Sequence, residues 1–133
     1  MNKLKTAAIA LGVFAGLSGA SHGPGEMLQG NVAPKGIVFS AWSQLTFLGG
    51  EPAMTFLPSL LAAGILTIIV GITVAVWAGK FARGRLGGPL LILLSVLMLL
   101  LGGGIVPPLF GIAGGLILIV DTCRITKNEG ANY

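Results

Sequence analysis

The sequence predicts an all-α integral membrane protein: a small bundle of four transmembrane helices, or three if residues 1-20 are a cleaved signal. The 133-residue chain is 54% hydrophobic and only 9% charged, whereas soluble domains typically contain about 25% charged residues. Between Pro52 and Val120 the charged residues are Lys80, Arg83 and Arg85 alone. They divide this stretch into apolar blocks long enough to cross a bilayer.

The first element, residues 1-20, has two interpretations. Lys3 and Lys5 precede a short apolar block that ends in small residues at Ala20, a pattern typical of a secretory signal with a cleavage site. An uncleaved anchor helix fits as well, because small residues recur at every fourth position, at Ala8, Gly12, Gly16 and Ala20, and such a face allows close contact with another helix. Both interpretations place residue 21 on the extracytoplasmic side.

Residues 21-55 are predicted to form an extracytoplasmic loop. His22-Gly-Pro-Gly-Glu26 has the proline and glycine content of a turn. From Ile37 to Leu48 apolar residues recur at helical spacing, and Trp42 favours a membrane interface. We therefore expect a short interfacial helix there, with a strand over 36–39 as the alternative.

The region 56-123 is predicted to contain three membrane helices, at 56-79, 88-104 and 107-123. The first would reach roughly 36 Å at about 1.5 Å per residue, which spans a hydrocarbon core of about 30 Å. A single helix over 89–120 would reach roughly 48 Å, which exceeds what tilt usually absorbs. Because a glycine triplet and a proline pair lie in its middle, at 102–108, we expect two short helices joined there by a hairpin or a functional break.

The basic residues predict the orientation. With a cytoplasmic amino end and four crossings, seven of the eight Lys and Arg residues lie inside and only Lys35 lies outside. This distribution follows the positive-inside rule. The sequence thus predicts a multi-pass protein of the plasma or inner cell membrane whose tail, 124-133, is cytoplasmic. Because the basic residues are scattered rather than gathered on one face, nucleic acid is not an expected partner.

Small residues along the helices predict close packing. The positions selected for this role are Gly12, Gly16, Thr67, Gly71, Ala75, Gly79, Gly111 and Gly115. Such faces let helix backbones approach one another in a membrane, and a chain of this size is expected to leave some of them unfilled. The leading hypothesis is therefore a non-enzymatic structural, assembly or accessory subunit that packs against itself or another membrane protein in the lipid bilayer.

Residues with catalytic or ligating chemistry are few, so no catalytic residue, cofactor or metal site is predicted. His22 and Glu26 are four residues apart and could ligate a metal on a helix, but the intervening Gly-Pro-Gly favours a solvated turn. The interiors of the predicted spans contain no ionisable residue, and Asp121, at the end of the last span, is expected to pair with Arg124. The alternative function is an oligomeric channel or transporter for a small neutral solute, and an enzyme at the outer interface is the third.

Two segments carry a resemblance to known proteins. Gly23-Pro-Gly-Glu26 with Gln29-Gly-Asn31, and Gly102-Gly-Gly104 before Pro107-Pro-Leu109, resemble a group of small prokaryotic hypothetical membrane proteins. The resemblance covers most of the chain and implies no activity, but it implies that both segments do more than connect helices. The chain departs from small four-span multidrug transporters, because its first span lacks their glutamate. It also departs from four-span thiol oxidases, because Cys123 is its single cysteine.

Overall fold

The computed structural model describes residues 1–42 and 52–131 and is mainly helical, as the sequence predicts. Its elements in chain order are α1 (Lys3–Ala20), α2 (His22–Leu28), β1 (Val38–Ser40), β2 (Pro52–Met54), α3 (Leu60–Val76), the π-helical turn η2 (Trp77–Phe81), α4 (Gly87–Leu101) and α5 (Val106–Gly130). The strands pair antiparallel, with Phe39 opposite Ala53. This short sheet is an addition to the all-α prediction.

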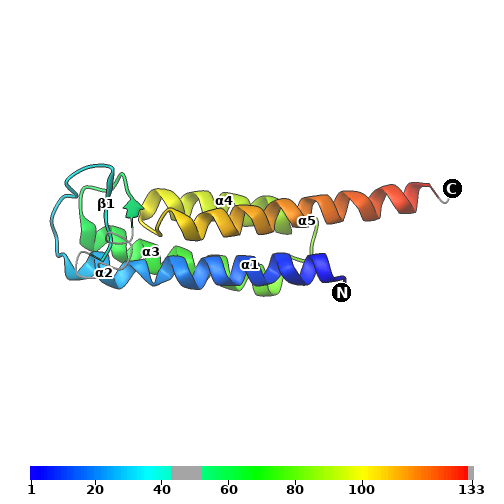
Figure 1. Ribbon diagram of the computed structural model, residues 1–133, viewed down its shortest axis with the longest axis horizontal. Helices are drawn as coiled ribbons and strands as arrows, with labels where there is room; N and C mark the ends of the chain where they lie inside the picture. The colour runs from blue at the N-terminus through cyan, green and yellow to red at the C-terminus, as the bar shows by residue number, and fades with distance from the viewer. Residues whose placement is uncertain (43–51, 132–133) are drawn as a thin grey trace.

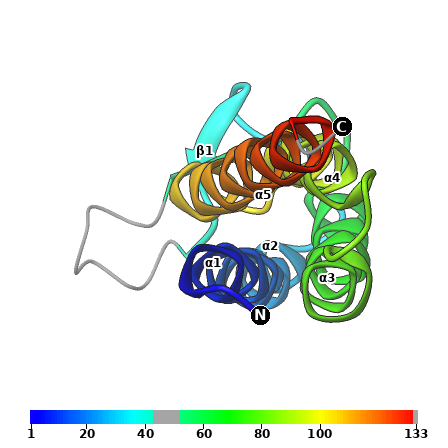
Figure 2. The same ribbon diagram turned by 90° about the vertical axis from the view of Figure 1, so that its right-hand side faces the viewer.

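The four longer helices lie side by side and alternate in direction (Figure 1), and the end-on view shows them grouped as a bundle (Figure 2). Both chain termini and the α3–α4 connection lie at one end, which we call the basic end. There the Lys5 Nζ donates to the Arg83 carbonyl over 3.2 Å. The α4–α5 turn, α2 and the sheet lie at the opposite end, which we call the α2 end.

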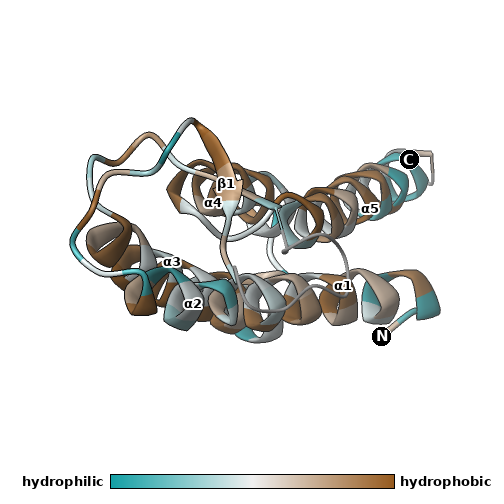
Figure 3. Cartoon of the chain, turned by 60° about the vertical axis from the view of Figure 1, so that its left-hand side comes forward, coloured by the Kyte–Doolittle hydropathy of each residue, from teal (hydrophilic) through white to brown (hydrophobic). Residues whose placement is uncertain are grey.

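In the part of the chain that the structure describes, three helical segments are long and apolar enough to cross a membrane: Lys3–Leu28, which combines α1 and α2, Leu60–Phe81 and Val106–Gly130. The fourth, α4, is apolar but shorter, and its 15 residues reach roughly 22 Å. Figure 3 shows apolar residues along these helices and hydrophilic residues at the chain termini and in the loops.

Glycines bring the helix backbones into direct contact. A Cβ placed on Gly16 would lie 2.4 Å from the Ala75 backbone nitrogen and 2.5 Å from the Gly71 carbonyl oxygen. In the same way, a Cβ on Gly115 would lie 2.8 Å from the Gly88 carbonyl oxygen. Because such distances leave no room for a side chain, α1 meets α3, and α4 meets α5, backbone to backbone.

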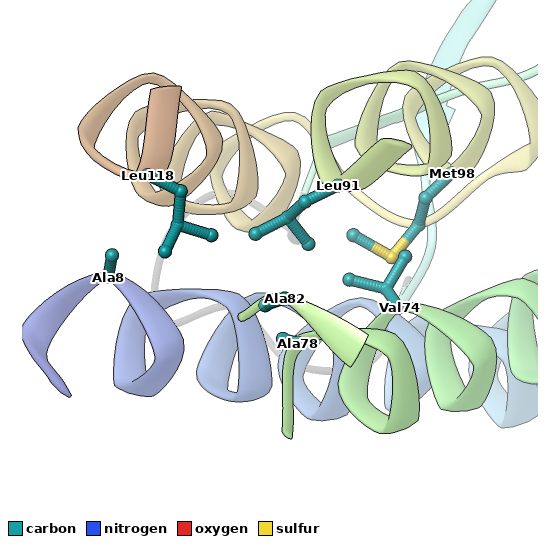
Figure 4. Close-up of a cluster of buried hydrophobic side chains, with 7 residues drawn as sticks. All are labelled: Ala8, Val74, Ala78, Ala82, Leu91, Met98 and Leu118. Atoms are coloured by element: carbon teal, nitrogen blue, oxygen red, sulfur yellow. The ribbon is translucent and has the colours of Figure 1, made fainter. Parts of the chain in front are cut away.

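A cluster of buried apolar side chains fills the centre of the bundle (Figure 4). It draws on α1, α3, η2, α4, α5 and the residue after η2, and consists of Ala8, Val74, Ala78, Ala82, Leu91, Met98 and Leu118. The side chains from α1 and η2 are alanines, while α4 and α5 supply the larger ones. Small residues on one side and large ones on the other allow the layers to interdigitate.

The predicted helix over 37–48 is wrong where the structure describes it, because Val38–Ser40 is β1; residues 43–48 lie outside the described residues. The alternative prediction of a strand is closer to the structure, because β1 pairs with β2. The spacing of apolar residues along 37–48 gives no information about such a partner strand. Also, α3 begins at Leu60 rather than residue 56, with the Ser59 hydroxyl as its cap. At the other end, α5 continues to Gly130 through most of the predicted tail.

Candidate functional site

The segment predicted as a turn, His22 to Glu26, is instead the first part of helix α2. Proline is tolerated because Pro24 is the third residue of this helix, where a backbone N–H has no intrahelical partner. The glycines are tolerated because each lies against a neighbouring element. Tertiary contacts therefore override the low helix propensity of Gly-Pro-Gly.

Both glycines of α2 are buried in close contacts. A Cβ on Gly23 would lie 2.6 Å from the Gly64 carbonyl oxygen of α3. On Gly25 it would lie 2.5 Å from the Ala41 carbonyl oxygen and 2.7 Å from the Trp42 ring. The indole nitrogen of Trp42 in turn donates to the Ser21 carbonyl over 3.1 Å. These contacts hold α2 between α3 and the chain that follows β1.

The third face of α2 carries Glu26, whose side chain is fully buried. Its carboxyl lies against Gly102, where an added Cβ would be 2.4 Å from Oε1 and 2.5 Å from Oε2. Gly102 has a φ of +124°, a conformation that L side chains rarely adopt. The turn after α4 can therefore lie directly on the carboxyl because residue 102 is glycine.

One hydroxyl group links Glu26 to the rest of the bundle. The Thr67 Oγ1 of α3 lies 3.4 Å from Glu26 Oε2 and 3.1 Å from the Leu101 carbonyl oxygen. Among the described residues, the other carboxyl oxygen, Oε1, has no hydrogen-bond partner. Burying a carboxyl oxygen without a partner is unfavourable, which makes Glu26 the candidate functional residue of this region.

His22, one helical turn before Glu26, lies against the second strained glycine of the same turn. Its side chain is 5% exposed, and its Nδ1 lies 3.0 Å from the Ser18 carbonyl oxygen. A Cβ on Gly104, where φ is +81°, would be 2.6 Å from His22 Nε2. His22 and Glu26 thus meet Gly104 and Gly102, one glycine for each side chain.

A cavity of about 170 Å³ adjoins His22 between α1 and α5. Apart from His22 and Ser18 its lining is apolar: Phe14, Pro52, Ile105, Val106, Pro107 and Phe110. The rings of Phe14 and Phe110 meet edge to face with centroids 5.4 Å apart. The cavity is therefore an apolar space with one polar wall.

The sheet and its flanking residues hold the α4–α5 turn in place. Ile105 donates its N–H to the Pro52 carbonyl over 3.2 Å, and Thr55 forms an isolated antiparallel bridge with Leu101. The α2 face, Thr67 and this turn together form what we call the Glu26 site. Its parts come from α2, α3 and the α4–α5 turn.

The structure places the residues selected for helix packing mostly inside the bundle. Gly12 lies against Ala78 and Leu91, and Gly111 lies against Ser95 and Ala15. Gly79 is the exception, since a Cβ there would meet just Val13 at 3.8 Å. The chain's own helices therefore fill most of these positions, and Gly79 is one that they leave open.

The expected Asp121–Arg124 pair is replaced by a different contact. Asp121 is 6% exposed, and its Oδ1 accepts a hydrogen bond of 2.6 Å from Asn2 Nδ2. Asn2 also caps α1 by accepting from the Lys5 N–H. Sequence spacing suggested the partner one helical turn away, whereas α1 brings Asn2 to Asp121 from the opposite end of the chain.

Among residues 1–42 and 52–131 the structure contains no group of three or more His, Cys, Asp or Glu side chains that could hold a metal ion. In comparisons with protein-family models, curated proteins and solved structures, nothing matches this chain. The Glu26 site itself therefore carries the functional argument.

Proposed function

We propose that the chain is a small, non-enzymatic, multi-pass protein of the cell membrane that belongs to the class of channels and transporters and binds a small cation at Glu26. The single observation that supports this most is the fully buried Glu26 carboxyl, with one oxygen lacking a partner. Ionisable residues in the interior of membrane bundles mark ion pathways and proton relays. Buried non-helical backbone is where such bundles bind ions, and the α4–α5 turn with Gly102 and Gly104 places such backbone beside Glu26.

This proposal takes up the alternative from the sequence, a channel or transporter, and replaces its small neutral solute with a cation. The choice of a neutral solute rested on the absence of an ionisable residue in the predicted spans, and Glu26 was assigned to a solvated loop. Because Glu26 is buried, its carboxyl can bind a cation inside the bundle, and the bound cation neutralises the negative charge of the carboxyl.

The proposed topology has four crossings with the basic end in the cytoplasm. Support comes from the segments that meet at that end, which carry seven of the eight basic residues, with Lys35 at the α2 end. The α2 end then faces the extracytoplasmic side, and α2 completes the first crossing, since Lys3–Leu28 together is long and apolar enough to span.

Flux into liposomes tests the proposed function. The purified chain is reconstituted into liposomes that contain a pH-sensitive or a sodium-sensitive dye. A gradient of protons or of Na⁺ is then imposed across the liposome membrane. We expect one of the two cations to enter faster than it enters empty liposomes. This flux should fall to the empty-liposome level in Glu26→Gln. It should persist in the control Glu129→Gln, since the Glu129 side chain is exposed on α5 at the basic end. Equal flux in wild type and Glu26→Gln, or none of either cation, would contradict the proposal.

An accessory or assembly subunit is the second candidate. The chain's own helices fill most of the small-residue faces. Exposed aromatic and aliphatic residues, Phe14, Val106 and Phe110, surround the cavity beside His22 and offer a surface for a membrane partner. Sizing in detergent and co-purification test this candidate. A monomer without a co-purifying protein would exclude it.

We further predict that α1 stays in the mature protein. Its buried residues, among them Ala8, Gly12 and Gly16, contact α3, η2, α4 and α5, so cleavage after Ala20 would expose backbone and apolar surface that the bundle otherwise covers. Intact-mass measurement of protein purified from membranes checks this: the expected mass includes residues 1-20. A mature chain that begins at residue 21 would contradict the four-helix arrangement.

A further inference from the structure

The Glu26 site has too few hydrogen-bond donors to stabilise an ionised carboxylate. Thr67 has one hydroxyl hydrogen, and two acceptors lie around it, the Leu101 carbonyl oxygen at 3.1 Å and Glu26 Oε2 at 3.4 Å. Leu101 is the last residue of α4, and the last four carbonyls of a helix have no intrahelical donor. The shorter distance therefore assigns the Thr67 hydrogen to Leu101.

With its hydrogen given to Leu101, Thr67 presents lone pairs to Glu26 Oε2. At 3.4 Å this contact is at the long limit of a hydrogen bond, and Glu26 can donate in it only as the protonated acid. α3, α4 and residues 102–105 contain no titratable side chain. The other titratable side chain of α2 is His22, whose Nδ1 lies 3.0 Å from the Ser18 carbonyl oxygen and whose Nε2 lies beside Gly104. In the described part of the other elements at this end, 29–42 and 52–59, the one charged side chain is Lys35, which is exposed.

A metal cation does not fit this arrangement of atoms. Ca²⁺ and Mg²⁺ lie about 2.0–2.6 Å from six or more oxygen ligands, which requires open space in front of the carboxyl. Gly102 already lies against both carboxyl oxygens.

We infer that the cation bound at Glu26 is a proton, held in the chain Glu26 Oε2–H to Thr67 Oγ1–H to the Leu101 carbonyl oxygen, and that its loss separates α2 from the α4–α5 turn. This inference rests on the proposed function and names its cation. Loss of the proton leaves a carboxylate with two unpaired oxygens, which is far more costly to bury than the neutral acid. Water can reach that carboxylate only if Gly102 moves away from it.

Infrared spectroscopy of the purified full chain tests where the proton is. A neutral carboxyl has a C=O stretch distinct from the carboxylate bands. At about pH 7, where exposed carboxyls are ionised, we expect the wild-type spectrum to contain this neutral band and Glu26→Gln to lose it. The control Glu129→Gln is expected to keep it. A neutral band equal in wild type and Glu26→Gln, or absent from wild type, overturns the inference.

Thr67→Val provides the second variant, which decides the matter if Glu26→Gln does not fold. It removes the acceptor of the proposed proton with little change in shape, so the neutral band is expected to persist and move to higher frequency as the acid loses its hydrogen bond. An unmoved band overturns the proposed chain. A neutral band without cation flux would refute the proposed function alone, and Glu26-dependent flux without the band would refute the inference alone.

Discussion

Gly71→Ala is expected to destabilise the bundle by about 1–3 kcal/mol or more, the usual range for overpacking a well-packed interior. The new Cβ would lie 2.7 Å from both the backbone nitrogen and the Cβ of Ala20, and 2.7 Å from the Gly16 carbonyl oxygen. Two of these atoms belong to the backbone of α1, so no side-chain rotation relieves the collision and the helices must separate. Thermal unfolding in detergent measures the loss.

The same four-residue stripe supplies the control. In Gly79→Ala the new Cβ meets just Val13 Cγ2 at 3.8 Å, an ordinary contact. We expect this variant to match wild type or to gain about 0.4–1 kcal/mol from the reduced freedom of its unfolded chain. If Gly71→Ala and Gly79→Ala unfold at the same temperature, the backbone contact between α1 and α3 is not what stabilises the bundle.

Gly102→Ala is expected to lose stability through two separate effects. Its positive φ strains any L residue, which costs roughly 1–3 kcal/mol, and the new Cβ would lie 2.4 Å from Glu26 Oε1. Gly30→Ala isolates the first effect, because Gly30 has a φ of +88° with nothing within 4 Å of an added Cβ. Thermal unfolding should therefore show a larger loss for Gly102→Ala, and infrared spectra should show the Glu26 carboxyl band altered in that variant alone.

A double-mutant cycle separates collision from strain more directly. Glu26→Ala removes the carboxyl that the new methyl group meets, so Gly102→Ala is expected to cost less in the Glu26→Ala background than in wild type. Contacting residues typically show interaction energies of about 0.5–3 kcal/mol. Strictly additive losses would mean that Gly102 does not press on Glu26.

The sequence allowed prediction of the helical class and of the segments available to form it, because hydrophobic length and charge placement act locally along the chain. The position of the α4–α5 turn could also be predicted, since the glycine triplet and Pro107 lie close together in the sequence. Helix α2 was not accessible. His22-Gly-Pro-Gly-Glu26 has the composition of a turn, and the contacts that make it helical come from Gly64, Trp42 and Gly102, all distant in sequence.

The candidate site was missed for the same reason. The two segments that carry the sequence resemblance, around Glu26 and around Gly102, gave no sign in isolation that one lies on the other. Thr67 was selected for its small size rather than for its hydroxyl. A stripe of small residues indicates that a helix will be approached closely, but it does not identify the approaching element, and here that element lies within the same chain.

The backbone contact between Gly16 and Gly71 also determines which motions the molecule can make. Because the main chains of α1 and α3 touch without intervening side chains, a sliding or rocking of one helix against the other would drive backbone into backbone. Ser21, which separates α1 from α2, lies beyond that contact. Gly23 of α2 lies against the Gly64 backbone of α3 in the same way, so α2 is fixed together with α1 and α3. A conformational change that exposes Glu26 is therefore expected to move the α4–α5 turn, with Gly102, away from α2.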